Sequence, residues 1–176
     1  KQPCSLNRLS NLIKATGTPC SPSTVMEYVR YLQESCLLIS IDNYVSKFVE
    51  KETIKKHYFV DNGLLHLFIN NPNTSLLENL CAITLYKKYA KGLYYYNKNI
   101  EVDFYVPDEG LAVQASYQMS DGETIEREVK ALVALHGLHP LKRAMIITYE
   151  DEGEIVRNGL RIEIKPAWKW VLEGRR

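Results

Sequence analysis

The residues best suited to chemistry in this sequence are a few polar side chains within otherwise apolar segments. Asp103 lies in the middle of the run Glu101-Val102-Asp103-Phe104, although aspartate is uncommon inside strands. Gln114 lies in the next apolar run, and Ser116 is two residues further, so both side chains would point to one face of that strand. Glu78 lies upstream, near the start of a helical segment. We therefore expect these four side chains to form one polar cluster.

Metal-dependent cleavage of phosphodiester bonds uses residues of this kind. Mg²⁺ prefers hard oxygen ligands that rigid elements hold close together. Such a site commonly also contains a lysine, which stabilises charge or positions the attacking water. The cluster offers the oxygen ligands but contains no lysine.

Each residue also has a structural explanation. Ser75-Leu76-Leu77-Glu78 fits a capping box, in which Glu78 would bond back to the start of its helix. Asp103 could lie on an exposed edge or pair with Lys98 or Arg127. Gln114 and Ser116 could be solvated strand residues.

The first part of the chain has the layout of a winged helix, because two helices are followed by a strand pair. Ser21 and Pro22 are suited to the start of the second helix. The expected elements are helices at residues 6–13 and 21–35, strands at 37–41 and 44–49, and a charged connector at 51–56. The apolar stripe of the second helix consists of Val25, Tyr28, Val29 and Leu32.

From residue 57 the pattern is that of an α/β domain. A short strand at 57–61 and a helical turn near 64–68 precede it. Helices are expected at 75–89 and 121–136 and near Trp168 and Trp170. Strands are expected at 93–96, 101–106, 111–117, 143–149 and 160–164, with a further short strand that ends at 156. This order predicts an α/β (α+β) sandwich with a mixed central sheet. We expect two domains, 1–56 and 57–176.

Several motifs taken together resemble one family over nearly the whole chain. They are Tyr31-Leu32, Tyr58-Phe59-Val60-Asp61-Asn62-Gly63, Glu78-Asn79, Glu101-Val102-Asp103-Phe104, Val113-Gln114-Ala115-Ser116-Tyr117 and Glu126-Arg127-Glu128. They are similar to the domain of unknown function that follows the ATPase core in predicted bacterial and archaeal AAA-type ATPases. The resemblance implies a winged helix followed by a restriction-endonuclease-like, PD-(D/E)XK-type domain, with the ATPase core of the same full-length chain as its partner.

The resemblance also implies roles for individual residues. Glu78 and Asp103 match the two acids of the superfamily, and Gln114 stands at the position of the acid that would complete the Mg²⁺ site. Ser116 stands where the lysine would be, so we expect a cation from the next helix, Lys130 or Arg127. Because an amide binds magnesium less well than a carboxylate, the site is expected to be degenerate.

Charge and composition limit the other functions. The net charge is +1, and the stretch 1–56 has eight lysines and arginines against five acids, so DNA binding remains a hypothesis centred on the lysines near residues 47–56. No GxxxxGK[ST] motif is present, so this stretch has no ATP site of that type. The four cysteines lack metal-site spacing, which favours a reduced, cytoplasmic protein, and the apolar runs are too short to span a bilayer, so no membrane partner is expected. Because the chain begins at Lys1, we expect it to be a piece of a longer protein.

The leading hypothesis is an accessory module of an ATPase that binds nucleic acid or protein. An Mg²⁺-dependent nuclease and a pure protein-interaction domain are the alternatives.

Overall fold

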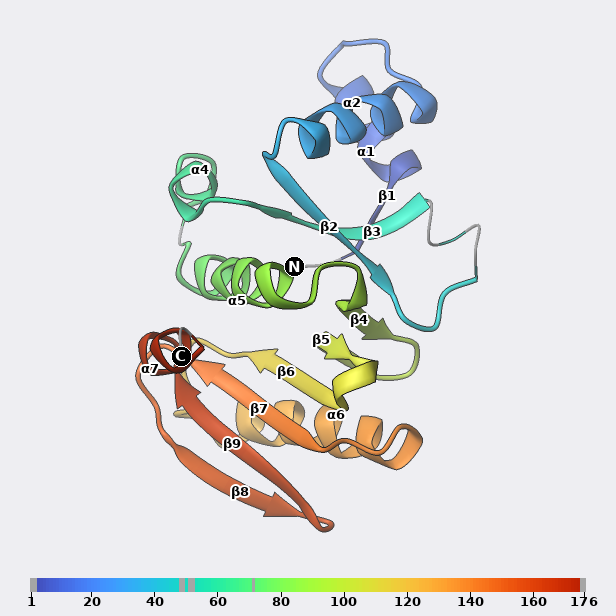
Figure 1. The fold of residues 1–176 in the computed structure, drawn as a ribbon. Coiled ribbons are helices and arrows are strands. Elements are labelled where there is room, and N and C mark those ends of the chain that lie inside the picture. The colour runs from blue at the N-terminus through green and yellow to red at the C-terminus, as the bar shows by residue number, and fades with distance from the viewer. Residues whose placement is uncertain (1–2, 48–49, 51–52, 71, 175–176) are drawn as a thin grey trace.

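A computed structural model describes residues 3–47, 50, 53–70 and 72–174 of the chain (Figure 1). Its helices are α1 (Leu6–Ala15), α2 (Pro22–Glu34), α4 (Asn62–His66), α5 (Asn73–Tyr89), α6 (Gly122–Leu138) and α7 (Ala167–Glu173). Its strands are β1 (Cys4–Ser5), β2 (Leu38–Asn43), β3 (Ile54–Phe59), β4 (Tyr94–Asn97), β5 (Glu101–Val106), β6 (Leu111–Ala115), β7 (Arg143–Thr148), β8 (Gly153–Arg157) and β9 (Leu160–Pro166).

The nine strands of the described residues form one mixed sheet in the order β1-β3-β2-β4-β5-β6-β7-β9-β8. The pairs β2–β4, β6–β7 and β7–β9 are parallel, and the other neighbours are antiparallel. This arrangement confirms the expected mixed α/β fold with a mixed central sheet.

The N-terminal strands belong to the same sheet as the rest. β2 joins β4 through two residue pairs, Asp42 with Tyr94 and Asn43 with Tyr95. The Asn43 side chain strengthens this junction, because its amide donates to the Asn97 carbonyl and accepts from the Asn97 N–H. The division expected between residues 56 and 57 falls inside β3, which pairs with β2 on both sides of that point.

The strand pairing near the N-terminus differs from the prediction. Residues 44–47, where the return strand was expected to begin, form a turn and an irregular segment, and residues 48 and 49 lie outside the described part. The partner of β2 is β3, which includes the end of the expected charged connector. Two adjacent lysines obscured this strand, whose register is set by a distant segment of sequence.

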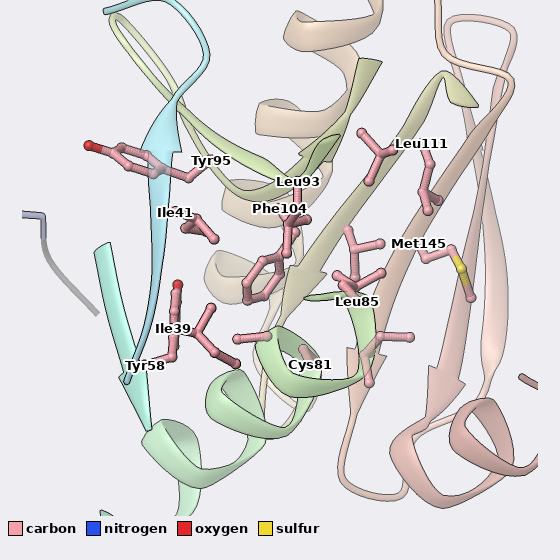
Figure 2. Close-up of a cluster of buried hydrophobic side chains, with 14 of the residues drawn as sticks. Ile39, Ile41, Tyr58, Cys81, Leu85, Leu93, Tyr95, Phe104, Leu111 and Met145 are labelled. Carbon is pink, nitrogen blue, oxygen red and sulfur yellow. The ribbon is translucent and has the colours of Figure 1, made fainter. Parts of the chain in front are cut away.

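Two helices cover the two faces of the sheet. Figure 2 shows the core beneath α5, where Tyr58, Cys81 and Phe104 are fully buried. The core beneath α6 contains Val102 and Leu132, with other apolar residues of β5 to β9. Asp103 and its neighbours lie between these two apolar cores, and the sheet therefore positions the polar cluster.

Candidate functional site

A pocket of about 830 Å³ lies against β5, β6 and α6, and its lining is rich in charge. Its charged lining residues are Glu78, Glu101, Asp103, Arg127, Glu128 and Lys130. We call this hollow the acid pocket.

The pocket opens where β5 and β6 separate. Their paired residues end at Phe104 and Val113, and beyond this point side chains supply the hydrogen bonds. The Gln114 Oε1 accepts from the Asp103 N–H at 2.8 Å, and the Asp103 Oδ2 accepts from the Ala115 N–H at 3.2 Å. The predicted proximity of Asp103 and Gln114 is thus present, and its cause is the bonding of each side chain to the opposite strand.

The alternation of β5 is interrupted beside the same point. Val102 contributes to the core beneath α6, as the period-two rule predicts for a neighbour of Asp103. Phe104, in contrast, packs beneath α5 with Tyr58, at a ring-centroid distance of 5.7 Å. Regular alternation would place Val102 and Phe104 on one face of β5, so the strand is irregular at Asp103.

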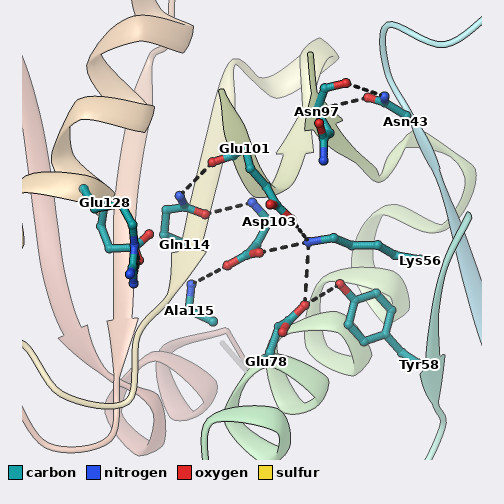
Figure 3. A network of polar contacts seen from close by, with 11 residues as sticks. Asn43, Lys56, Tyr58, Glu78, Asn97, Glu101, Asp103, Gln114, Ala115 and Glu128 are labelled. Atoms are coloured by element: carbon teal, nitrogen blue, oxygen red, sulfur yellow. Dashed lines mark hydrogen bonds and ion pairs between the residues drawn. The ribbon is translucent and has the colours of Figure 1, made fainter. Parts of the chain in front are cut away.

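A lysine from the N-terminal part of the chain reaches the acids. Figure 3 shows Lys56 of β3 pointing at Asp103, Glu101 and Glu78. Its Nζ lies 3.0 Å from the Asp103 Oδ1, 3.0 Å from the Glu101 Oε1 and 3.8 Å from the Glu78 Oε1. The Lys56 side chain has no exposed surface. A buried ammonium without partners would be very costly, and the three carboxylates provide the compensation.

The same surroundings fix the charge of Lys56. Burial disfavours the ammonium, but Asp103, Glu78 and Glu101 outweigh it and raise the pKa of Lys56 above its ordinary value. An amine that acts as a nucleophile or general base needs a lowered pKa. Lys56 is therefore a permanent cation at neutral pH.

Glu78 reaches the cluster from α5, with a partner that the sequence did not indicate. The Tyr58 hydroxyl donates to the Glu78 Oε1 at 2.8 Å, and both side chains are buried. Burial, followed by the nearby charges of Glu78 and Asp103, raises the pKa values of the Tyr58 hydroxyl and the Cys81 thiol. Glu78 is the sixth residue of α5, which begins at Asn73 with no side-chain cap, so the capping-box explanation is wrong.

The far wall of the pocket belongs to α6. Arg127 pairs with Glu128, whose carboxylate accepts from the Arg127 Nη2 at 2.7 Å. Burial raises the pKa of Glu128 despite this bond. Lys130 is mostly exposed and lies 3.7 Å from Glu126, so neither expected cation of this helix is in the cluster around Asp103.

The expected ligands of Mg²⁺ do not fit a metal ion in this arrangement. The Asp103 carboxylate is bound to Lys56 and to the Ala115 N–H, and the Gln114 amide bridges the β5 backbone by donating to the Glu101 carbonyl at 3.1 Å. Among the described residues, no group of three or more acids, histidines or cysteines is arranged to hold a metal ion. Ser116 is buried elsewhere, where its hydroxyl donates to the Gln118 carbonyl.

Sequence reasoning missed Lys56, Tyr58 and Glu101 as members of the cluster. Lys56 and Tyr58 are two residues apart, so they share one face of a strand. A buried aromatic at 58 would have indicated that Lys56 points inward. The acids that bind it are 22 to 47 residues away in sequence, and no local pattern connects them.

A second unusual region lies on α2, at the end of the molecule opposite β8 (Figure 1). Of the thirteen residues of α2, all of them described, only Val25 is fully buried. Tyr28, Tyr31 and Leu32 are 56%, 49% and 39% exposed, so the expected stripe is covered at Val25 but not at Tyr28 and Leu32. Spacings of three and four residues place these three on one helix face, which we call the α2 surface.

One relative aligns with almost the whole chain. An uncharacterized protein of Methanocaldococcus jannaschii is 30% identical over 183 aligned positions, which cover 96% of this chain and 40% of the relative. The chain thus spans about two fifths of that relative's length. No protein-family model and no solved structure matches the chain significantly. Among the helices of the described residues, none is both long and apolar enough to cross a membrane.

Proposed function

We propose that this chain is an accessory module of a longer protein of the AAA-type ATPase kind. In this proposal α2 binds the ATPase core of the same full-length chain, and a nuclease-like domain carries a degenerate site. The exposed apolar face of α2 is the observation that carries the proposal, because a helix with this stripe normally buries it. The resemblance of the motifs and the greater length of the relative agree with it.

The charge distribution favours a protein partner over DNA. The lysines that could have contacted phosphates are in part used internally, since Lys55 pairs with Asp42 at 3.0 Å and Lys56 is buried among the acids. On α2 the one basic residue, Arg30, lies 3.5 Å from Glu34. Binding to DNA relies on basic residues that can reach phosphates.

Hydrogen–deuterium exchange compared between the 176-residue chain and the full-length protein tests the proposal. We expect the amides of α2 to exchange more slowly in the full-length protein, while those of exposed β8 serve as the internal control and stay unchanged. Equal exchange of α2 in both proteins would contradict docking on the ATPase core. Binding to duplex DNA that weakens as salt rises would instead favour the nucleic-acid hypothesis.

A cleavage assay tests the degenerate site. Plasmid and oligonucleotide substrates are incubated with Mg²⁺ or Mn²⁺ and with either the wild type or Asp103→Ala. We expect no cleavage above the Asp103→Ala background, because Lys56 and backbone groups already occupy the oxygens of Asp103. Cleavage that depends on Asp103 would establish the nuclease alternative.

A further inference from the structure

The cluster around Lys56 differs from the metal site that the resemblance implies, because an ammonium lies where its carboxylates converge. We infer that the ammonium of Lys56 is the resident cation of this site, so that the wild-type protein takes up no divalent cation there. A variant that lacks the ammonium should acquire a divalent-cation site on the carboxylates of Glu78, Glu101 and Asp103.

The geometry around the Lys56 Nζ supports this inference. Three carboxylate oxygens from α5 and β5 converge on one nitrogen, at 3.0, 3.0 and 3.8 Å. The three acids and one ammonium retain a formal charge of −2, which becomes −3 when the ammonium is removed. Carboxylate oxygens that converge on one point are the ligands that hard divalent cations prefer.

The fold also prevents Lys56 from leaving the acids. Lys56 pairs with Ile41 across the β2–β3 ladder, and its Nζ lies 5.5 Å from the centroid of the Tyr95 ring. The side chain is fully buried, so it cannot exchange one partner for solvent as a surface lysine does. A divalent ion would have to enter beside a fixed positive charge, and Coulomb repulsion opposes this at short distance.

The distances predict which ion would enter after removal of the ammonium. Ca²⁺ binds oxygens at about 2.3–2.6 Å in flexible geometry, whereas Mg²⁺ requires about 2.0–2.1 Å and near-octahedral order. Oxygens that now lie 3.0 Å or more from the nitrogen need to move less for Ca²⁺. We therefore expect Ca²⁺ to bind the variant more tightly than Mg²⁺.

Calorimetric titration of Ca²⁺ and Mg²⁺ into the 176-residue chain at constant ionic strength provides the test, with thermal unfolding as a second readout. The variant is Lys56→Met, and Lys55→Met, whose ammonium pairs with Asp42 outside the cluster, is the matched control. We expect no saturable binding for the wild type and Lys55→Met. We expect one site in Lys56→Met, at least about tenfold tighter for Ca²⁺ than any binding to the wild type, and a higher melting temperature with Ca²⁺.

Further variants identify the site and guard against misfolding. Lys56→Met combined with Asp103→Asn should lose the Ca²⁺ site, and binding that persists would place the ion elsewhere and overturn the inference. Equal binding by the wild type and Lys56→Met would also overturn it. If Lys56→Met is unfolded without ions, Ca²⁺ should restore its circular dichroism spectrum, and a failure to do so counts against the inference. None of these results depends on α2 docking, so the two proposals can fail separately.

Discussion

In most proteins charged side chains are exposed and apolar side chains are buried. The cluster around Lys56 and the α2 surface depart from this rule in opposite ways. The first buries a lysine completely and Glu78 nearly so, and the second exposes two tyrosines and a leucine. The buried charge has its partners inside the chain, at 3.0 Å from two carboxylates. The exposed apolar face has no comparable cover among the described residues. The cluster is thus complete in itself, whereas the α2 surface is explained by a partner outside this stretch of chain.

Removing the cation should have the largest effect on the 176-residue chain. Lys56→Met leaves the buried Glu78 and the partly buried Asp103 without their counter-charge, and breaking a buried pair in this way costs about 3–5 kcal/mol. The free energy of unfolding is measured by urea denaturation without divalent ions.

Lys55→Met provides the comparison on the same strand. Its ion pair with Asp42 is partly exposed, so we expect a cost of about 1 kcal/mol or less. Equal losses of unfolding free energy in the two variants would show that Lys56 contributes no more than a surface lysine. The buried cluster would then not differ in stability from an ordinary surface ion pair.

The hydroxyl of Tyr58 should have the next largest effect. Tyr58→Phe keeps the ring in the core beneath α5 but removes the hydrogen bond to the buried Glu78 carboxylate. Bonds to charged groups contribute about 1.5–3 kcal/mol, and urea denaturation measures the loss. Tyr149→Phe, at a half-exposed ring, is the control and should change stability by less than about 0.5 kcal/mol.

Alkaline pH should weaken the cluster more gradually. The folded-state pKa of Lys56 is raised, so its stabilisation is fully present below the unfolded-state pKa and is lost as the pH rises through the folded-state pKa. We therefore expect the difference in unfolding free energy between the wild type and Lys56→Met to stay constant near neutrality and to shrink above the ordinary lysine pKa.

The ionisation of a buried tyrosine, Tyr95, also affects stability at high pH. Burial raises the pKa of Tyr95 to about 12, so its ionisation destabilises the fold at high pH in both proteins. Because the charge of Lys56 also lowers the pKa of Tyr95, the wild type and Lys56→Met are compared in a Tyr95→Phe background, which removes this contribution from both. A difference that grows with pH would contradict the assignment of Lys56 as the stabilising cation.

Local patterns in the sequence predicted much of the fold. The strand at 101–106 and the helix ending at 89 were correct, because strand propensity and apolar spacing act over a few residues. The proximity of Asp103 and Gln114 was also predicted, since consecutive strands joined by a short turn pair with each other.

Long-range pairing accounts for what was missed. β3 was divided between a connector and a short strand, because Lys55-Lys56 interrupts its apolar pattern and the strand is defined by its pairing with β1 and β2. The burial of Lys56 depends on acids of α5 and β5, which no neighbouring residue indicates. The α2 stripe shows the opposite case: the local pattern is present, but it does not specify which surface would cover Tyr28 and Leu32.

The smallest effect on the isolated chain is expected on the α2 surface. Tyr28→Ser and Tyr31→Ser remove side chains that are about half exposed, so each should change the free energy of unfolding of the 176-residue chain by less than about 0.5 kcal/mol. The same substitutions in the full-length protein should have a larger effect, because tyrosines are often central to protein interfaces and their truncation there commonly costs more than about 1 kcal/mol.

The measurement is α2 hydrogen exchange in the full-length protein, with Trp168→Ser as a control at an exposed aromatic distant from α2. If Tyr28→Ser leaves that exchange as slow as in the wild type, the α2 surface is not the docking face, and its exposure would need another explanation. If α2 exchange in Tyr28→Ser rises to the level of the 176-residue chain while Trp168→Ser leaves it unchanged, the two regions differ as proposed. The α2 surface then contacts another part of the longer protein, whereas Lys56 stabilises the 176-residue chain itself.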